Sequence, residues 1–103
     1  MEIKELTEAM HEFVGSQGWY DALSSKPQTL RNLAISLNLE ANEVLEFFQW
    51  SENIENVEAF SDELADVALY LLQIASLAGI DLEKAILSKL EKNYHRDWSS
   101  REP

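Results

Sequence analysis

The sequence predicts an all-α, four-helix-bundle-like fold that forms oligomers, with residues 1–103 making one domain. Four segments carry apolar residues at helical spacing, and no segment shows the apolar-polar alternation that is typical of a strand. Short polar connections join these segments, as in helical bundles. The two central segments also carry apolar residues outside their main stripes, which so short a chain cannot bury by itself. We expect these residues at the contact between subunits: Ile35, Leu39, Phe47, Leu69, Leu72 and Leu77.

The first helix is expected from Glu2 to Val14, where apolar residues recur at helical spacing, and Gly15 is expected to end it. Glycine, serine and proline then mark a connecting segment as far as Pro27. Trp19 lies in this segment. An aromatic residue on such a loop more often covers the edge of a core, but Trp19 is also a candidate wall for a flat ring of a ligand.

The second helix is expected from Leu30 to about Trp50. Thr29 is its candidate N-cap, because a threonine side chain accepts a hydrogen bond from a free backbone N–H of the first turn. A polar stretch over residues 51–56 then interrupts the apolar pattern.

The third helix is expected to begin within residues 56–61 and to run to Ala78, with Gly79 as its C-terminal cap. Asp81 is the candidate N-cap of the fourth helix, which carries a stripe of leucine, alanine and isoleucine. The tail from residue 97 to residue 103 is polar, and we expect it to fray.

The composition limits the possible partners. The chain has 19 acidic and 8 basic residues and a net charge of -11, so its surface repels nucleic acid and anionic membranes. The phosphates of a nucleotide would also be repelled unless a metal ion reversed the local field. Cysteine is absent, which excludes disulfides and thiolate metal sites. The N-terminus lacks the apolar core of a signal peptide and no apolar run could span a bilayer, so we expect a cytoplasmic protein.

Two acidic pairs mark the central helices: Glu40 with Glu43, and Glu63 with Asp66. Each pair is spaced i, i+3, which places both carboxylates on one face, about 60° apart. If the two helices pack side by side, the four acids meet, and like charges about 4 Å apart repel by about 1 kcal/mol in water and about 4 kcal/mol at a protein surface. The acids then point apart into water, take up protons, or bind a divalent cation. Carboxylates without histidine or cysteine favour Mg²⁺ or Mn²⁺ over zinc.

These acids belong to longer motifs that resemble the MazG-like, all-α nucleoside triphosphate pyrophosphatases, and in particular their dCTP pyrophosphatase branch. The resemblance covers roughly residues 30–93. It implies a Mg²⁺-dependent hydrolase that releases pyrophosphate and a nucleoside monophosphate and works as a dimer or a dimer of dimers. The motifs that carry it are Arg31-Asn-Leu, Glu40-x-x-Glu43-x-x-Glu46-Phe-Phe-Gln-Trp50, Asp62-Glu-Leu-Ala-Asp66-Val-x-x-Tyr70 and Asp81-Leu-x-x-Ala-Ile-x-x-Lys89-Leu-x-x-Asn93.

The same resemblance implies a role for each matching residue. Glu40, Glu43, Glu63 and Asp66 match the metal ligands, and the substrate-binding matches are Trp50 for the base, Tyr70 for the phosphates or sugar, Asn93 for the nucleotide and Lys89 for a phosphate. Arg31 is a further basic candidate. For the chemistry, Glu43 or Glu46 could accept a proton from the attacking water, and Lys89 or Arg31 could add positive charge beside the phosphates.

The chain departs from the family pattern near the base-binding region. It lacks the histidine that closely follows the tryptophan matching Trp19, and it has Leu30 where the family has a proline. After Asn93 it continues with Tyr-His-Arg-Asp-Trp rather than Lys-Tyr-Pro. These differences bear on which nucleotide is the substrate more than on the chemistry.

Other interpretations are open on the residues alone. Trp50 could simply end a helix against the core, and Lys89 could be solvated. A Glu8-x-x-His11 motif has the spacing of a di-iron ligand pair, but such sites need the motif twice, and His95 has no glutamate three residues before it. A second alternative is a non-catalytic acidic adaptor or antitoxin-like module whose exposed apolar residues bind a partner protein.

Overall fold

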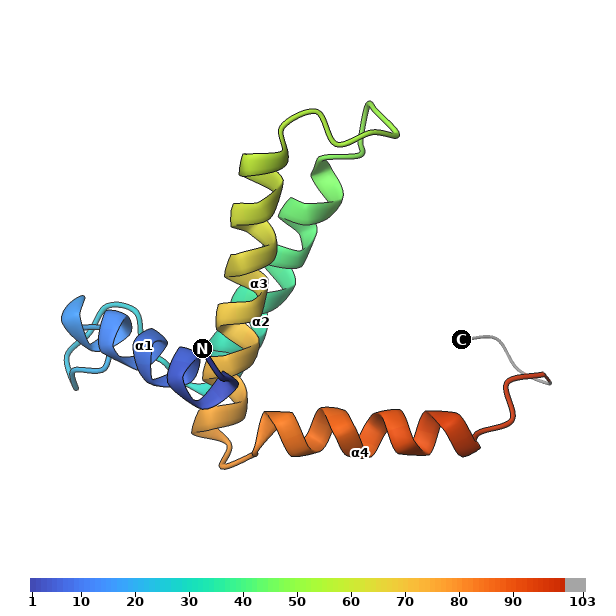
Figure 1. The fold of residues 1–103 in the computed structure, drawn as a ribbon. Helices are drawn as coiled ribbons and strands as arrows, with labels where there is room; N and C mark the ends of the chain where they lie inside the picture. Colours follow the sequence, from blue (N-terminus) through green and yellow to red (C-terminus); the bar gives the residue numbers. More distant parts are fainter. Residues whose placement is uncertain (100–103) are drawn as a thin grey trace.

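The computed structural model describes residues 1–99, and in this part of the chain it contains four helices and no strand. The helices are α1 (Ile3–Ser16), α2 (Leu30–Glu46), α3 (Val57–Leu77) and α4 (Leu82–His95). Figure 1 shows α2 and α3 side by side, α1 packed across the C-terminal half of α3, and α4 leaving in another direction. The all-α class is confirmed. Residues 100–103 of the tail that we expected to fray lie outside the described residues.

Side chains close the N-termini of the last three helices. Thr29, Asn56 and Asp81 each accept a hydrogen bond from the backbone N–H three residues later, at 3.1, 3.0 and 3.1 Å. Each bond satisfies one of the N–H groups that the first turn leaves free. Gly79 follows α3 with a φ of 72°, a left-handed conformation that glycine adopts at little cost. The predicted caps at Thr29, Gly79 and Asp81 are therefore confirmed.

The first helix does not stop at Gly15, as the sequence predicted. It continues to Ser16, and the residue with a left-handed backbone is Gly18, with a φ of 75°. A lone glycine weakens a helix but does not end it unless the chain also leaves the helical conformation there. The chain therefore turns after α1 at Gly18 and not at Gly15.

The second helix ends at Glu46, four residues before the predicted end at Trp50. Beyond this point the backbone N–H groups of residues 47–49 bond to the carbonyls three residues earlier, which tightens the chain into turns. The rings of Phe47 and Phe48 meet Phe60 edge-on, with centroids 5.2 and 5.7 Å apart. This aromatic contact closes the far end of the α2–α3 pair.

The core of the chain is small. It lies where α1 crosses the α2–α3 pair, and its buried apolar residues are Met10, Val14, Leu33, Leu72 and Ala75. Leu72, which we expected at a subunit contact, is only 8% exposed because it lies on the part of α3 that α1 covers. Four other residues of that predicted contact are exposed: Ile35, Leu39, Leu69 and Leu77.

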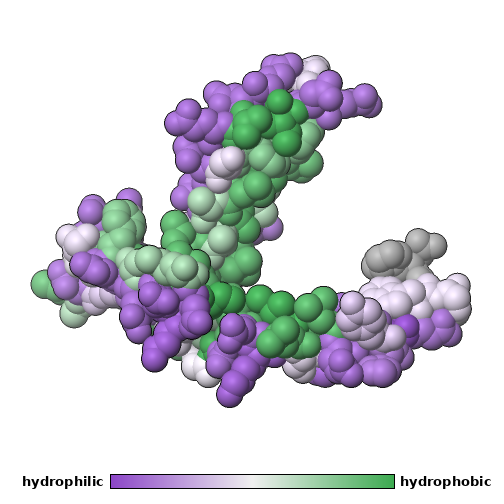
Figure 2. Space-filling view, viewed as in Figure 1, coloured by the Kyte–Doolittle hydropathy of each residue, from purple (hydrophilic) through white to green (hydrophobic). Residues whose placement is uncertain are grey.

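The fourth helix does not pack along the others. The axes of α3 and α4 are bent by 101°, so α4 extends away from the rest of the chain (Figure 1). The radius of gyration is 16.5 Å, where a compact chain of this length would have about 13 Å. Figure 2 shows apolar side chains gathered along the α2–α3 pair and along the first turns of α4. One chain therefore leaves much apolar surface uncovered.

Within residues 1–99, none of the four helices taken singly has the length and apolar character to cross a membrane. Only α3 and α4 taken together, bent as they are, meet that test of length and composition.

Candidate active site

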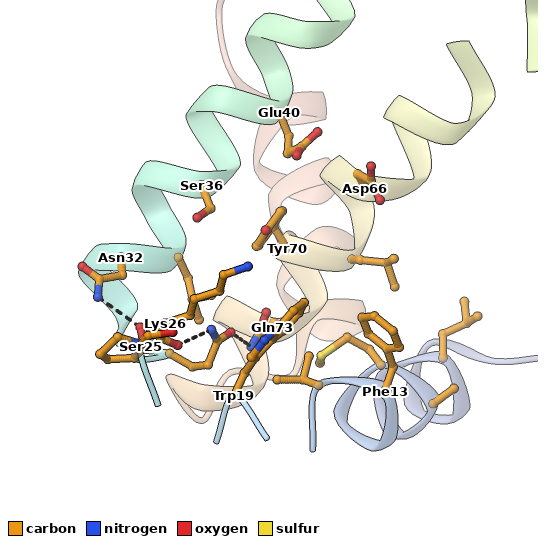
Figure 3. A pocket seen from close by; sticks show the side chains of 18 residues that line it. Phe13, Trp19, Ser25, Lys26, Asn32, Ser36, Glu40, Asp66, Tyr70 and Gln73 are labelled. Atoms are coloured by element: carbon orange, nitrogen blue, oxygen red, sulfur yellow. Dashed lines mark hydrogen bonds between the residues drawn. The ribbon is translucent and has the colours of Figure 1, made fainter. Parts of the chain in front are cut away.

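Polar side chains from α2 and α3 face one another across a cavity of about 690 Å³. On α2 they recur every four residues at Asn32, Ser36 and Glu40, and on α3 they lie at Asp66, Tyr70 and Gln73. Figure 3 shows Glu40 and Asp66 at one end of this cavity and Trp19 and Gln73 at the other. The volume is in the range of small-molecule sites.

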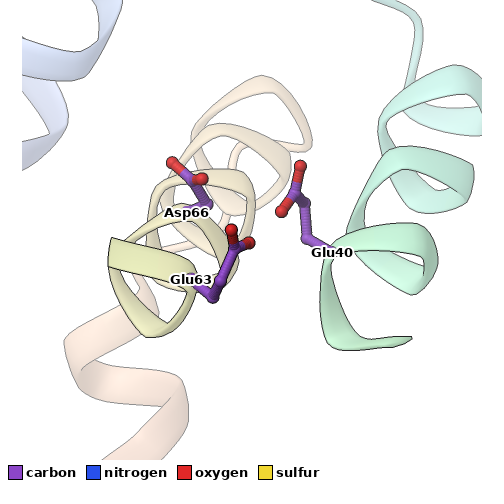
Figure 4. A group of neighbouring side chains, drawn as sticks. All are labelled: Glu40, Glu63 and Asp66. Carbon is purple, nitrogen blue, oxygen red and sulfur yellow. The ribbon is translucent and has the colours of Figure 1, made fainter. Parts of the chain in front are cut away.

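Three carboxylates converge at one end of the cavity. Each of Glu40, Glu63 and Asp66 offers an oxygen that lies within 4.8 Å of those of the other two (Figure 4). Glu40 comes from α2, whereas Glu63 and Asp66 lie one turn apart on α3. The packing of α2 on α3 therefore brings together acids that lie more than 20 residues apart in the sequence.

The arrangement is unfavourable without a positive charge. Burial raises the pKa of Glu40, and the neighbouring carboxylate of Glu63 and the charges of Asp66 and Glu43 raise it further. Burial and the charges of Glu63 and Asp62 raise the pKa of Asp66. Both shifts show that the fold disfavours the ionised acids.

A divalent cation fits this donor set. Glu63 Oε2 is buried and has no hydrogen-bond partner within residues 1–99. A buried carboxylate oxygen without a donor is costly, and a cation would satisfy it while neutralising the mutual repulsion. Three carboxylates without histidine or cysteine are the ligands that a hard cation prefers.

Glu43 and Glu46 lie outside this group. Glu43 is exposed, and its charge contributes to the raised pKa of Glu40, so it lies close to the cluster without joining it. Glu46 is also exposed and accepts a hydrogen bond of 3.4 Å from Asn42 Nδ2. The structure thus brings together three of the four metal ligands that the family motif implied.

Two of the predicted substrate-binding residues line the cavity, Trp19 and Tyr70. Trp19 is held by an edge-on contact with Phe13, with ring centroids 5.7 Å apart. Lys26 Nζ lies 5.0 Å from the centroid of the Trp19 ring. The Trp19 ring therefore forms an aromatic wall of the cavity, and the Lys26 ammonium group makes a cation–π contact with it.

The other predicted substrate-binding residues do not line the cavity of their own chain. Trp50 is 91% exposed in the connection between α2 and α3, and Arg31 is exposed on the first turn of α2. Lys89 and Asn93 lie on α4, which points away (Figure 1). Asn93 Oδ1 is buried without a hydrogen-bond partner among the described residues.

The structure adds cavity residues that the sequence analysis missed: Lys26, Gln28, Asn32, Ser36 and Gln73. Lys26 is the one basic side chain among the lining residues, within the part of the chain that the structure describes. Gln73 is only 3% exposed. A signal for Gln73 was present, because a lone amide interrupts the otherwise apolar and aromatic run of α3 from Leu69 to Ala75.

The di-iron alternative gains no support from the site. The carboxylate cluster within residues 1–99 contains no histidine. His11 instead lies within hydrogen-bonding distance of Tyr20 and Ser76, at 2.6 Å from each hydroxyl oxygen.

Fold and site together define an all-α protein with a carboxylate cluster, suited to a divalent cation, at one end of a cavity. A model of the MazG-like family matches residues 35–100, and the chain belongs to this family. The resemblance seen in the sequence is thereby confirmed.

Similar proteins include the dCTP pyrophosphatase 1 of Rattus norvegicus, which is 35% identical over 64% of this chain, and that of Homo sapiens, 36% identical over the same share. A dATP/dGTP diphosphohydrolase of Salmonella phage PMBT28 is 50% identical over 39% of this chain. The chain spans 44% of the length of the two mammalian proteins and 14% of the phage protein.

Proposed function

We propose that this protein is a Mg²⁺-dependent nucleoside triphosphate pyrophosphohydrolase, which converts a (d)NTP and water into a (d)NMP and pyrophosphate. The observation that carries the proposal is the cluster of three carboxylates, with a buried, unpartnered oxygen on Glu63, at one end of a cavity of about 690 Å³. A triphosphate can approach such a cluster only with a cation between them. The names of the similar proteins support the same chemistry, with dCTP the first substrate to test and Mn²⁺ the second candidate metal.

Glu40, Glu63 and Asp66, with Glu43 completing the set, would hold Mg²⁺, which when bound supplies positive charge beside the phosphates and lowers the pKa of water. Water attacks phosphorus, and the bond between the α- and β-phosphoryl groups breaks to release pyrophosphate. A remaining carboxylate accepts the proton of the water: Glu46, or Glu43 where Glu43 does not ligate the metal ion.

The remaining cavity residues bind and orient the nucleotide. Lys26 Nζ lies 5.0 Å from the centroid of the Trp19 ring, and we expect it to turn from there toward the phosphates. Lys26 is the one basic side chain that lines the cavity within residues 1–99. Trp19 and Tyr70 bracket the base and sugar.

We further infer that the working form is a homodimer or homotetramer. The accessible surface of one chain is 8191 Å², about 2,300 Å² more than a folded monomer of this mass exposes. A partner that covers this apolar surface could also bring its own α4 to the cavity. Lys89 and Asn93 lie on α4, away from the cavity of their own chain. In such an assembly they would reach the nucleotide that is bound to the other subunit.

The test is to incubate the protein with each (d)NTP and Mg²⁺ and to measure monophosphate and pyrophosphate. We expect both products in equal amounts, and at least a tenfold lower rate for Asp66→Asn. Glu58→Gln, at an exposed acid on the first turn of α3, is the control and should keep the rate. Equal rates for the two variants would remove Asp66 from the site. A role in clearing unwanted nucleotides from the cytoplasmic pool would follow from a broad substrate range.

The alternative function is a non-catalytic acidic interaction module, adaptor or antitoxin-like, which the exposed apolar surface would also suit. It predicts no product with any nucleotide and no rise of melting temperature with Mg²⁺ and nucleotide, whereas the enzyme predicts both.

A further inference from the structure

A chain of hydrogen bonds runs beneath the cavity from α3 through the connecting loop to α1 and back to α3. Gln73 Nε2 lies 2.8 Å from Gln28 Oε1 and 3.2 Å from Tyr20 Oη. Tyr20 Oη lies 2.6 Å from His11 Nδ1, and His11 Nε2 lies 2.6 Å from Ser76 Oγ. No step of the proposed reaction uses this network.

The direction of each bond follows from one backbone carbonyl. Gln28 Nε2 donates to the carbonyl oxygen of Lys26 at 2.7 Å, so Gln28 turns its own amide oxygen toward Gln73. Gln73 must therefore present its NH₂ group there, and this group has two hydrogens, one for Gln28 and one for Tyr20.

The rest of the network follows from the same rule. Because Tyr20 Oη accepts from Gln73, its own hydrogen goes to His11 Nδ1. Burial raises the pKa of Tyr20, which keeps the phenol protonated and able to donate. His11 then donates from Nε2 to Ser76.

These bonds leave one group of the Gln73 side chain without a hydrogen-bond partner among residues 1–99, the carbonyl oxygen Oε1. The side chain is 3% exposed and lines the cavity, so this acceptor lies where a ligand can reach it. Gln73 lies seven residues from Asp66 along α3, about 10 Å along the helix axis. A nucleotide with its phosphates at the carboxylates would extend its base toward this end of the cavity (Figure 3).

We propose that Gln73 Oε1 selects the base by accepting a hydrogen bond from an exocyclic amino group, and that Tyr20 and His11 are positioning residues that hold it in that orientation. The inference rests on the proposed function and adds a specificity-determining group to it. A base that carries carbonyl oxygens on both sides of its ring N–H, such as thymine or uracil, would bring one of them against Oε1. A base without any N–H donor would cover this acceptor and leave it unpaired, which costs binding free energy.

Matched pairs of substrates test the inference. dCTP is compared with the triphosphate of 2-pyrimidinone deoxyriboside, and dATP with that of purine deoxyriboside; each analogue lacks only the amino group. We expect kcat/KM to fall about tenfold or more on loss of the amino group, as for one hydrogen bond to a buried acceptor. Equal kcat/KM within both pairs would overturn the inference and leave the proposed function standing. If no triphosphate is hydrolysed, the proposed function fails and the inference falls with it.

Tyr20→Phe tests the positioning role, because it removes the hydroxyl that Gln73 and His11 share without changing any group that faces the nucleotide. We expect the preference for the amino-bearing substrate to drop at least threefold, through KM, with kcat within twofold. Tyr94→Phe, on a tyrosine of α4 that is 84% exposed, is the matched control. A merely structural role would lower the activity on both members of a pair equally, and that result would remove Tyr20 from base selection. Gln73→Glu keeps an acceptor but loses the donors that orient it, so it should also reduce the preference.

Discussion

The carboxylate cluster predicts that neutralising one acid will stabilise the metal-free protein. The perturbation is Glu40→Gln, which keeps the size of the side chain and removes one of three charges that lie within 4.8 Å of one another. A pair of unit charges at this distance repels by about 0.9 kcal/mol in water and about 3.5 kcal/mol at an effective dielectric of 20. Because the three side chains are partly exposed, the lower part of this range applies.

We therefore expect the free energy of unfolding of the metal-free variant to exceed that of the wild type by about 1–2 kcal/mol at pH 7. For a domain of this size, each kcal/mol raises the melting temperature by about 4–8 °C. The pH dependence has a definite sign. The pKa of Glu40 is raised in the folded state, so the fold favours its protonated form. The stabilising effect of protonation is complete below the ordinary pKa of 4.5 and is lost as the pH rises through the raised value.

The assay is thermal unfolding in the presence of a chelator, at one protein concentration, from pH 4 to pH 8. The gain of Glu40→Gln over the wild type should grow with pH, and Mg²⁺ should stabilise the wild type but not the variant. Glu12→Gln, on the exposed face of α1, makes the same change of net charge and should have no such effect. A metal-free Glu40→Gln variant that is less stable than the wild type at pH 7 would refute the reasoning.

Further predictions concern the substrate, the metal and the subunit contact. Lys26→Met should raise KM for the nucleotide about tenfold, because it removes the basic group that lines the cavity, whereas Lys4→Met on the exposed face of α1 should not. Mg²⁺ with a non-hydrolysable nucleotide at about 100 times its Kd should stabilise the fold by about 2.7 kcal/mol, an effect that EDTA should reverse in a thermal-unfolding assay. Leu87→Glu, at an α4 residue that is 60% exposed, should yield a smaller species in light scattering, since it places a charge on the exposed apolar surface that we propose a partner subunit covers; Leu23→Glu, at a loop leucine that is 99% exposed, should leave the mass unchanged. An unchanged mass for Leu87→Glu would exclude that part of α4 from the contact.

Local sequence was enough to predict the helices and most of their ends. The stripes of apolar residues and the side-chain caps at Thr29 and Asp81 act within a few residues of one another, so they are visible without the fold. A predicted helix end was wrong where a tertiary contact determines the position at which the helix stops. The second helix stops at Glu46 because residues 47 and 48 turn to pack on Phe60, which lies on the next helix.

The carboxylate end of the site was also visible in the sequence, because its motif places carboxylates at helical spacing. The sequence did not show which of these carboxylates lie close to one another in the fold. Glu43 lies about 60° around α2 from Glu40, and only the packing of α2 on α3 shows that Glu40 reaches Glu63 and Asp66 while Glu43 stays exposed.

The sequence by itself determined that the chain is helical, strongly acidic and equipped with carboxylates for a hard cation, because composition and helical periodicity are local properties. Only the tertiary structure decided the other end of the cavity. Gln73 bonds to Tyr20 across 53 residues, and Ser76 bonds to His11 across 65. No spacing rule relates residues so far apart; they meet because α1 and its loop bury apolar surface against α3, and that packing fixes Gln73 at the end of the cavity opposite Glu40 and Asp66.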